Sequence, residues 1–500
     1  MGKRLTTGRV SPVTISGWGF VAQFLAFLDL LEYAALLDLP GQGYQRVMIP
    51  IARLMLTYQL KVLLGIGSIN LAPTKLFREV ALLRLIGYTT IQMQVGFCRR
   101  GNLAVGPMHK NTLADAAERL TADELEAVLN GVAQRLAARG FFRTSRGHFA
   151  LDASDLETTA RYTGAGVKRV TERKVTRQKQ IVEVERLVYG FKVLIVYEVR
   201  LRLVVAAKVA PINEHESRSM RALVRQAVAN LGSGVLRVLL IDCGFLDGAD
   251  LWWLRYGMRI DFVVPSKANM LITADAQGLC RRLDPAAGIV QQERSGKPKV
   301  GKNGQVRQVG QVTVIGVPEL RSYDRYGTAE HAKGANRTDF VGNALNAVVV
   351  TRWQGEAAVP GEETVFLTSL PVGQPLAVLD LYDLRSLIEN TAFRELKQGW
   401  QLKCYPKKTE TAVRGHVFLT LVTFTLANAF QTKRGRALTA AGIRHQRAAQ
   451  YSARVIVFAD GYYALFEIEE VFILLGVIPE QCLRTDPARV RRKYGLPEVA

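Results

Sequence analysis

The sequence predicts a mixed α/β domain that is interrupted by a β-rich insertion and flanked by helical N-terminal and C-terminal regions. Three observations support this fold class. Apolar residues recur at helical spacing up to residue 146, and short runs of β-branched residues replace them from residue 147. A stretch rich in Gly, Pro, Thr and Val then lacks helical periodicity, and a long helical pattern follows it. Strands that alternate with helices are typical of a mixed sheet.

We predict five regions along the 500 residues. They are a helical N-terminal region at 1–146, the first part of the α/β domain at 147–270, the β-rich insertion at 271–373, the second part of the α/β domain at 374–432, and a basic C-terminal region at 433–500. At roughly 100–200 residues per domain, a chain of this length holds about three or four domains or large subdomains.

The N-terminal region begins with an apolar run at helical spacing, Trp18–Leu37. Two helix-start signals stand close together further along. Asn111–Asp115 predicts the start of one helix, and Thr121–Glu124 is a capping box that predicts the start of the next. Two short helices joined so tightly form either a helix-turn-helix or a helical hairpin that only packs.

Strands and helices alternate after residue 147. The predicted strands are His148–Asp152, Leu187–Val199, Leu201–Val209, Val235–Asp242 and Ile260–Val264, and the predicted helices are Asn213–Leu231 and Asp247–Tyr256. Leu187–Val199 and Leu201–Val209 are rich in β-branched residues and should pair antiparallel. Val235–Asp242 is almost wholly apolar, as expected for the centre of a sheet.

The insertion and the region after it have different patterns. Gln311–Ile315, Ala347–Arg352 and Thr364–Ser369 are candidate strands between turn-rich loops, and Ala377–Trp400 is predicted to be one long helix. His416–Phe430 carries no formal charge, but it is shorter than the roughly 18 residues expected of a membrane span. We therefore expect a buried core helix there.

Three carboxylates stand where a fold of this kind could bring them together. Asp152 ends one predicted strand, and Asp242 ends the central one, directly before Cys243 and Gly244. Glu389 shares a helical face with Tyr382 and Arg385, at positions i, i+3 and i+7. In α/β sheets, ligands bind beyond the carboxyl ends of the strands, which is where both aspartates are predicted to lie.

Converging carboxylates suit divalent metal ions. Mg²⁺ prefers hard oxygen ligands and keeps several of its waters. Two such ions about 3.5–4 Å apart can stabilise the attacking and the leaving oxygen of an in-line displacement at phosphorus. We therefore predict that Asp152, Asp242 and Glu389 hold two Mg²⁺ or Mn²⁺ ions.

The charge of the chain indicates a polyanionic partner. With 66 Lys and Arg against 44 Asp and Glu, the formal net charge is +22 and the sequence pI is about 9.9. The run Lys168–Lys179, the glycine-containing segment 294–307 and the tail segment Arg489–Lys493 concentrate basic residues, and each is either a solvated segment or a DNA contact. The five cysteines are scattered without a C-x-x-C pair, which suits a reducing cytoplasm and argues against structural zinc.

Other polar residues near these motifs have simpler interpretations. Asp247 is expected to cap the helix that follows it. Asp155 and Glu157 are expected to be solvated or salt-bridged, although either could support a metal ligand from outside its coordination shell. The six histidines show no metal-binding spacing, so we expect them to be structural or exposed.

These motifs resemble those of insertion-sequence transposases of the DDE type, in particular the bacterial insertion-sequence-four group. Asp152 matches the first aspartate of that family, Asp242-Cys243-Gly244-Phe245 matches its Asp-x-Gly-Tyr/Phe signature, and Tyr382, Arg385 and Glu389 match its Tyr-x-x-Arg-x-x-x-Glu helix. The resemblance covers about residues 148–430 and includes the β-rich insertion. It implies an RNase H-like catalytic domain.

The sequence departs from the family at one position. The family places a lysine seven residues after its glutamate, where this chain has Leu396. Either Lys397, one residue later, or Arg394 takes the cationic role. Glu395 is a second candidate for the catalytic glutamate, and Glu389 is preferred because Tyr382 and Arg385 fix the register.

The resemblance also implies what the protein does. It predicts a transposase that cleaves DNA at the terminal inverted repeats of a mobile element and transfers the freed ends to target DNA, working as a homodimer in the bacterial cytoplasm at the nucleoid. Residues 1–146 would bind DNA, and Tyr382, Arg385 and either Lys397 or Arg394 would contact its phosphates. Two alternatives remain: a transposase-derived DNA-binding protein that no longer cuts, and an RNase H-like nuclease without strand transfer.

Overall fold

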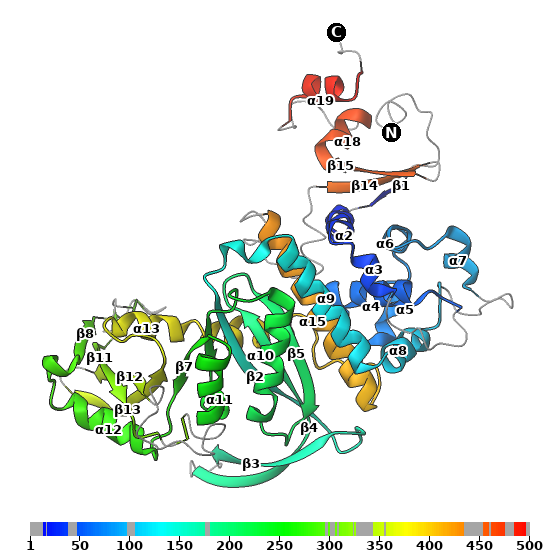
Figure 1. The fold of residues 1–500 in the computed structure, drawn as a ribbon. Coiled ribbons are helices and arrows are strands. Elements are labelled where there is room, and N and C mark those ends of the chain that lie inside the picture. Colours follow the sequence, from blue (N-terminus) through cyan, green and yellow to red (C-terminus); the bar gives the residue numbers. More distant parts are fainter. Residues whose placement is uncertain are drawn as a thin grey trace. The chain divides into compact units, whose positions relative to one another are not determined.

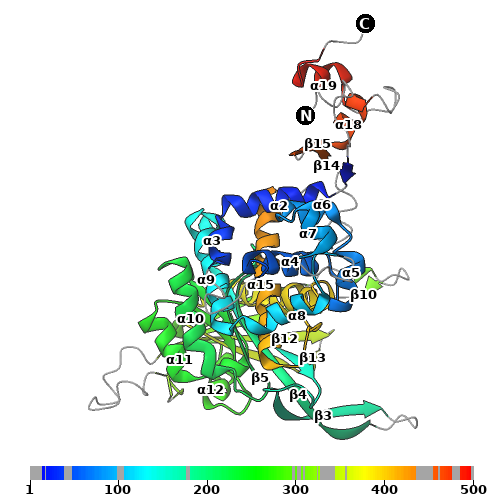
Figure 2. The ribbon, with the colours of Figure 1, turned by 90° about the vertical axis from the view of Figure 1, so that its right-hand side faces the viewer.

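The computed structural model divides the chain into two compact units, Met1–Val128 together with Leu396–Ala500, and Leu129–Glu395 (Figures 1 and 2). The residues that it describes are 14–16, 18–38, 48–97, 106–175, 181–295, 299–300, 306–307, 310–323, 325–326, 344–354, 357–434, 454–459, 462–475 and 485–496.

Five strands of the second unit form a mixed sheet in the order β5-β4-β2-β6-β7. They are β2 (His148–Thr158), β4 (Ile181–Glu198), β5 (Leu203–Pro211), β6 (Val238–Ile241) and β7 (Asp261–Pro265). β4 is antiparallel to β2 and β5, whereas β6 is parallel to β2 and β7. This order and these directions are those of an RNase H-like sheet, so the predicted mixed α/β fold is confirmed, including the antiparallel pair β4–β5.

Helices connect the parallel strands of this sheet. α10 (Ser217–Leu231) leads from β5 to β6, and α11 (Gly248–Trp252) with the π-helical η4 (Trp253–Gly257) leads from β6 to β7 (Figure 1). α10 buries one apolar stripe against β5, formed by Met220, Leu223, Val224, Ala227 and Leu231. Asp247 caps α11 as predicted, because its side chain accepts hydrogen bonds from the backbone amides of Ala249 and Asp250.

β2 and β4 extend further than the sequence pattern indicated, whereas β6 is shorter than the predicted strand Val235–Asp242. β2 was expected to end at Asp152, but it continues to Thr158 because β4 pairs with it along its length. β3 (Gly166–Val175) pairs with the first half of β4. The run Lys168–Lys179 therefore begins within a strand, and its residues 176–179 lie outside the described part. Lys168 forms an ion pair with Asp155, and Arg186 forms one with Glu157.

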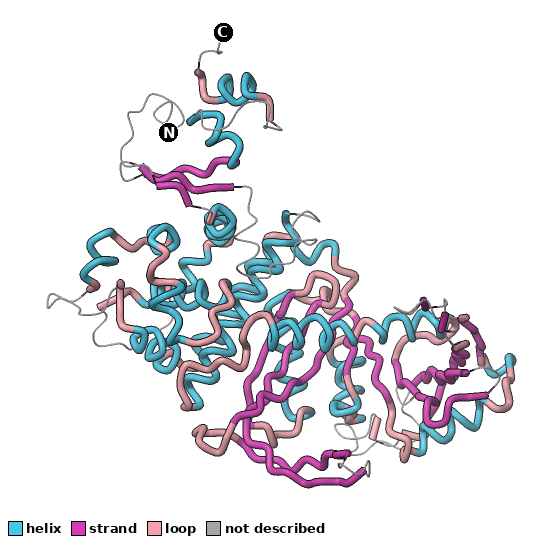
Figure 3. The backbone as a smooth tube through the Cα atoms, turned by 180° about the vertical axis from the view of Figure 1, so that it is seen from behind, coloured by secondary structure: helices cyan, strands magenta, loops and turns pink. Residues whose placement is uncertain are grey.

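The insertion continues the main sheet. Its elements are α12 (Leu271–Cys280), β8 (Val290–Arg294), β9 (Lys299–Val300), β10 (Val306–Arg307), β11 (Val312–Leu320), β12 (Leu345–Gln354) and β13 (Ala357–Thr368). β13 pairs antiparallel with β7, and β12, β11 and β8 follow in that order. Figure 3 shows the strands from behind, in magenta. The inserted strands thus extend the RNase H-like sheet beyond β7, because β13 is hydrogen-bonded to that strand. Much of the segment 294–307 lies outside the described residues.

The prediction of one long helix over Ala377–Trp400 is wrong. The chain forms α13 (Pro375–Asp383), a turn at Leu384 and Arg385, the π-helical η6 (Ile388–Phe393), and then α14 (Arg394–Gln398). Backbone hydrogen bonds in a π-helix join residues five apart instead of four, so the residue spacing of an ideal α-helix does not describe this segment.

The first unit is largely helical where it is described. α4 (Ile51–Leu63) and α8 (Lys110–Arg119) pack against the long α15 (Glu410–Arg434). The remaining helices near these are α2 (Gly19–Leu30), α3 (Tyr33–Leu37), η1 (Ile69–Leu71), α5 (Ala72–Lys75), α6 (Val80–Leu85), α7 (Thr90–Val95) and α9 (Ala122–Ala138), and short turns elsewhere in the chain are η2 (Phe141–Thr144), η3 (Cys243–Phe245) and η5 (Pro285–Ala287). The predicted capping box is formed, because Thr121 and Glu124 exchange hydrogen bonds at the start of α9.

α15 is the only helix, within the described part of the chain, that is long and apolar enough to cross a membrane. Its most apolar window is 94% buried inside the protein, as expected of a core helix.

The apolar run Trp18–Leu37 forms two helices, α2 and α3, instead of one. The chain breaks between them because Glu32 adopts a left-handed backbone conformation.

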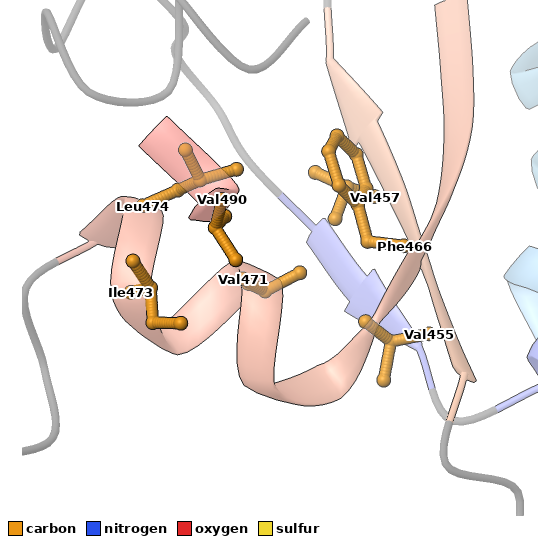
Figure 4. Close-up of a cluster of buried hydrophobic side chains, with 7 residues drawn as sticks. All are labelled: Val455, Val457, Phe466, Val471, Ile473, Leu474 and Val490. Atoms are coloured by element: carbon orange, nitrogen blue, oxygen red, sulfur yellow. The ribbon is translucent and has the colours of Figure 1, made fainter. Parts of the chain in front are cut away.

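A small sheet brings together the two ends of the chain within the first unit. β1 (Thr14–Ser16) pairs with β14 (Arg454–Ala459), which pairs with β15 (Tyr462–Glu467). α18 (Ile468–Leu475) and α19 (Pro487–Lys493) follow. Figure 4 shows the apolar cluster that joins them, formed by Val455, Val457, Phe466, Val471, Ile473, Leu474 and Val490.

A neutral histidine is buried between α4, α15 and the segment before α15. His416 Nε2 lies 2.9 Å from the carbonyl oxygen of Gln401, and its Nδ1 lies 2.8 Å from the hydroxyl of Tyr58. A carbonyl only accepts, so Nε2 carries the proton and Nδ1 accepts from Tyr58. Burial, together with the charge of Lys61, lowers the pKa of His416 to about 3.

We expect this histidine to make the first unit sensitive to acid. Below pH 6.5 the unfolded chain binds a proton at His416 that the folded chain excludes, so stability falls as the pH decreases from 6.5 towards 3. Between pH 7 and pH 5 the loss should reach about 2 kcal/mol. Urea denaturation of wild type and His416→Gln at both pH values measures it. An identical loss in the two proteins would contradict the assignment.

Candidate active site

Three carboxylates from distant parts of the second unit surround one arginine nitrogen. Nη2 of Arg385 lies 2.9 Å from Oε1 of Glu389. The same nitrogen lies 3.3 Å from Oδ2 of Asp152 and 3.4 Å from Oδ2 of Asp242. The structure therefore brings the three acidic residues singled out in the sequence to one place.

Two of these carboxylates are placed by neighbouring strands of the sheet. β2 and β6 run parallel, and Leu151 of β2 is the register partner of Ile241 of β6. Asp152 and Asp242 come directly after these partners, so they lie side by side, Asp152 still within β2 and Asp242 just after the end of β6. Both strands are buried at this point, which holds the aspartates on a rigid base.

Each aspartate is also fixed by a backbone amide. Oδ1 of Asp152 accepts a hydrogen bond of 2.8 Å from the amide of Ala153. Oδ1 of Asp242 accepts one of 2.8 Å from the amide of Cys243, at the start of the turn η3. In both residues the other oxygen, Oδ2, is left to face the shared cation.

The break in the predicted helix places the third carboxylate. Arg385 lies in the turn between α13 and η6, and Glu389 lies in the π-helical segment after it. The side chain of Arg385 is only 11% exposed, whereas that of Glu389 is 54% exposed. The arginine is thus the inner residue of this segment and the glutamate reaches it from the solvent side.

Burial and the charge of Arg385 shift the pKa of Asp152 in opposite directions. Burial raises the pKa of Asp152 to about 7, although the charge of Arg385 and the amide of Ala153 oppose the rise, and the nearby Asp242 and Glu389 add to it. Burial alone would lower the pKa of Arg385, but Asp152 and the other acidic groups raise it overall. The cluster therefore favours a bound cation in its centre.

Tyr382 lies on α13 beside this cluster. Its ring centroid is 4.5 Å from that of Phe366 on β13, and burial raises the pKa of its hydroxyl. The predicted DNA contacts of Tyr382 and Arg385 stay predictions. Arg394 is exposed at the start of α14, and Lys397 follows the end of the second unit, so the choice between these two cations also stays open.

The structure separates the two candidate glutamates. Glu389 joins the aspartates, whereas Oε2 of Glu395 accepts a hydrogen bond of 2.8 Å from Arg202. The register fixed by Tyr382 and Arg385 thus selects the glutamate that lies in the cluster.

One cation near the site was not singled out in the sequence. Lys267 follows the end of β7, the strand beside β6, and it is exposed. Burial raises the pKa of the Cys243 thiol, and the positive charge of Lys267 partly counters that rise, which places it near the turn after Asp242. A lysine directly after a predicted strand, on the edge that carries both aspartates, is the signal that could have identified it.

The residues of this cluster fit a divalent metal ion. Within the described residues, no three His, Cys, Asp or Glu side chains form a ready-made metal site, because here a guanidinium nitrogen separates the carboxylates at hydrogen-bond distances. The donors themselves are hard oxygens that already converge on one positive charge, which is the donor set that Mg²⁺ prefers. Asp152, Asp242 and Glu389 would hold it.

The family model described as "Transposase DDE domain" matches residues 143–426, which is more than half of the chain. No curated protein matches. Among solved structures, the chain is similar to a piggyBac transposase synaptic complex with hairpin DNA, with 9% sequence identity and a TM-score of 0.38 over 95% of this chain and 86% of that one.

Proposed function

The chain belongs to the transposase family with a DDE domain, and we propose that it cleaves DNA at the ends of a mobile element and joins the freed ends to target DNA. The observation that carries this proposal is the convergence of Asp152, Asp242 and Glu389 on one cationic centre, beside the carboxyl end of β6 and the middle of β2. Bound divalent ions would stabilise the attacking and leaving oxygens at phosphorus.

The protein's own side chains would hold the DNA strand at that centre. Arg385 is suited to a phosphate, since its Nε is buried without a hydrogen-bond partner among the described atoms and can donate to a phosphate oxygen. Tyr382 lies on the same segment, and Lys267 is a third group on this edge of the sheet. Together they would orient the scissile phosphate over the three carboxylates.

The net charge of +22 supports DNA as the partner, because Lys and Arg that replace condensed counterions dominate affinity for the phosphate backbone. We further propose that the element belongs to the insertion-sequence-four group, on the spacing of Tyr382, Arg385 and Glu389. On this proposal the protein works as a homodimer on two DNA ends, at the nucleoid in the bacterial cytoplasm. Three cysteines within the described residues are free thiols, which suits that compartment.

Paired cleavage and joining assays test the proposed function. With Mg²⁺ and DNA that carries the element's inverted repeats, we expect nicking at the repeat ends and covalent joining of those ends to a target plasmid, and EDTA should abolish both. Cleavage without joining would indicate a nuclease. Salt-sensitive DNA binding without cleavage would indicate a DNA-binding protein that has lost its activity.

A further inference from the structure

An ion pair between a buried lysine and a partly exposed glutamate lies against the turn that carries Asp242. Lys192 of β4 has a side chain that is only 9% exposed, and its Nζ donates a hydrogen bond of 2.8 Å to Oε1 of Glu216. The same Nζ lies 3.3 Å from the carbonyl oxygen of Glu214. Glu216 directly precedes α10, so the pair links β4 to the start of that helix. A buried lysine left without its carboxylate would be costly, which fixes Glu216 in place.

The second oxygen of this glutamate occupies the space beside Gly244. A Cβ atom added to Gly244 would lie 2.6 Å from Oε2 of Glu216, which is closer than such atoms approach each other. Gly244 does not have a positive φ, so its backbone conformation would accept other residues. The carboxylate of Glu216, and not the conformation of the turn, limits the space for a larger residue at this position.

The turn is therefore confined from two directions. Phe245 is fully buried on one side of it, and the carboxylate of Glu216 contacts Gly244 on another. Asp242 starts this turn, and its Oδ1 accepts the hydrogen bond from Cys243 within it. A shift of the turn would consequently move the carboxylate of Asp242 relative to Asp152.

We propose that Glu216, held by Lys192, is a positioning residue that sets the place of Asp242 through its contact with Gly244. The consequence for catalysis rests on the proposed function, but the contact itself does not. In Gly244→Ala, the added methyl group would push either the turn or the ion pair. Because Glu216 is held by a buried lysine, the turn would yield.

A substitution cycle tests this contact. Gly244→Ala is made in the wild-type protein and in a protein with Lys192→Met and Glu216→Ala, which removes both charges together. In wild type we expect a decrease of about 10²-fold in the cleavage rate at saturating DNA, with DNA affinity unchanged. In the double-substituted protein, the same change should cost less than about 3-fold, because the space is open. Gly278→Ala, at a glycine with nothing within 4 Å of the added Cβ, is the matched control and should leave the rate unchanged.

Melting temperatures provide a readout that needs no activity. Gly244→Ala should lower the Tm of the wild-type protein by roughly 2–10 °C and should leave that of the double-substituted protein almost unchanged. Equal effects of Gly244→Ala in the two proteins, on rate and on Tm, would overturn the proposal. A different outcome is that Gly244→Ala lowers the Tm of the wild-type protein but not that of the double-substituted protein, while the wild-type protein does not cleave DNA. In that case the contact between Glu216 and Gly244 is supported and the proposed function is wrong.

A second variant covers the case in which the double-substituted protein does not fold. Glu216→Asp keeps a carboxylate near Lys192 but shortens the side chain by one methylene, which withdraws it from Gly244. The protein that carries both Gly244→Ala and Glu216→Asp should then cleave DNA at most of the wild-type rate, unlike the protein with Gly244→Ala alone. Failure of this variant to restore either the rate or the Tm of Gly244→Ala would count against the role of Glu216.

Discussion

Asp242→Asn is expected to reduce DNA cleavage by more than about 10³-fold while the protein stays folded. Asparagine has the same shape and can still accept the hydrogen bond from the amide of Cys243. It removes one negative charge from the three that face Nη2 of Arg385, and with it a ligand for a divalent ion. The side chain of Asp242 is 38% exposed, so its loss of charge should have little effect on stability.

The measurement is single-turnover cleavage of DNA with element ends in Mg²⁺, with DNA binding measured in parallel. Asp155→Asn is the matched control, since Asp155 lies three residues after Asp152 on the same strand but pairs with Lys168 instead of joining the cluster. We expect the control to cleave at nearly the wild-type rate. Cleavage by Asp242→Asn within about ten-fold of wild type would show that the cluster is not the catalytic centre.

Much of the site could be predicted from the sequence because two of its residues depend on strands. A buried strand is short, apolar and rigid, so a carboxylate at its end has a defined position. Val235–Asp242 has this pattern, and the parallel register of Leu151 with Ile241 then sets Asp152 beside Asp242. The mixed α/β class followed from the alternation of strands and helices, whereas the order of the strands is seen only in the structure.

The geometry around Arg385 could not be predicted in the same way. A spacing of i, i+3 and i+7 places residues on one face only if the helix is continuous, and here a turn and a π-helical segment interrupt it. The arginine was expected to bind phosphate, yet it lies between carboxylates from three separate segments. Such a contact depends on tertiary packing and leaves no periodic signal.

The ion pair between Lys192 and Glu216 could not be predicted for a similar reason. Lys192 lies within the apolar pattern of the predicted strand Leu187–Val199, and Glu216 lies near the start of the predicted helix Asn213–Leu231. Their pairing brings together β4 and the beginning of α10, which are separated by a strand and a turn. Local sequence shows neither the burial of Lys192 nor the space that Glu216 occupies beside Gly244.

Arg385→Met should give the largest change in stability among the variants of this site. The substitution leaves Asp152, whose side chain is 7% exposed, without the cation that faces it. Removing one member of a buried ion pair costs about 3 kcal/mol or more. We therefore expect a clear decrease in the Tm of the full-length protein in metal-free buffer, measured by calorimetry.

Divalent ions should reverse part of this loss. In wild type, the guanidinium already occupies the space between the three carboxylates and offsets part of their charge, whereas in Arg385→Met they are free to bind Mg²⁺. A ligand that binds only the folded state raises stability with its concentration, so Mg²⁺ should raise the Tm of Arg385→Met more than that of wild type. Arg294→Met is the control, because Arg294 pairs with Asp380 at the surface and its side chain is 41% exposed.

The comparison of the two arginines separates a metal site from an ordinary ion-pair cluster. If Arg385 only neutralised acidic side chains, Mg²⁺ would change the Tm of Arg385→Met and Arg294→Met equally. A larger Mg²⁺ response in Arg385→Met alone would mean that the cationic centre among Asp152, Asp242 and Glu389 accepts either a guanidinium or a divalent ion. An arginine that competes with the metal in this way would keep the buried carboxylates paired until metal and DNA are both bound.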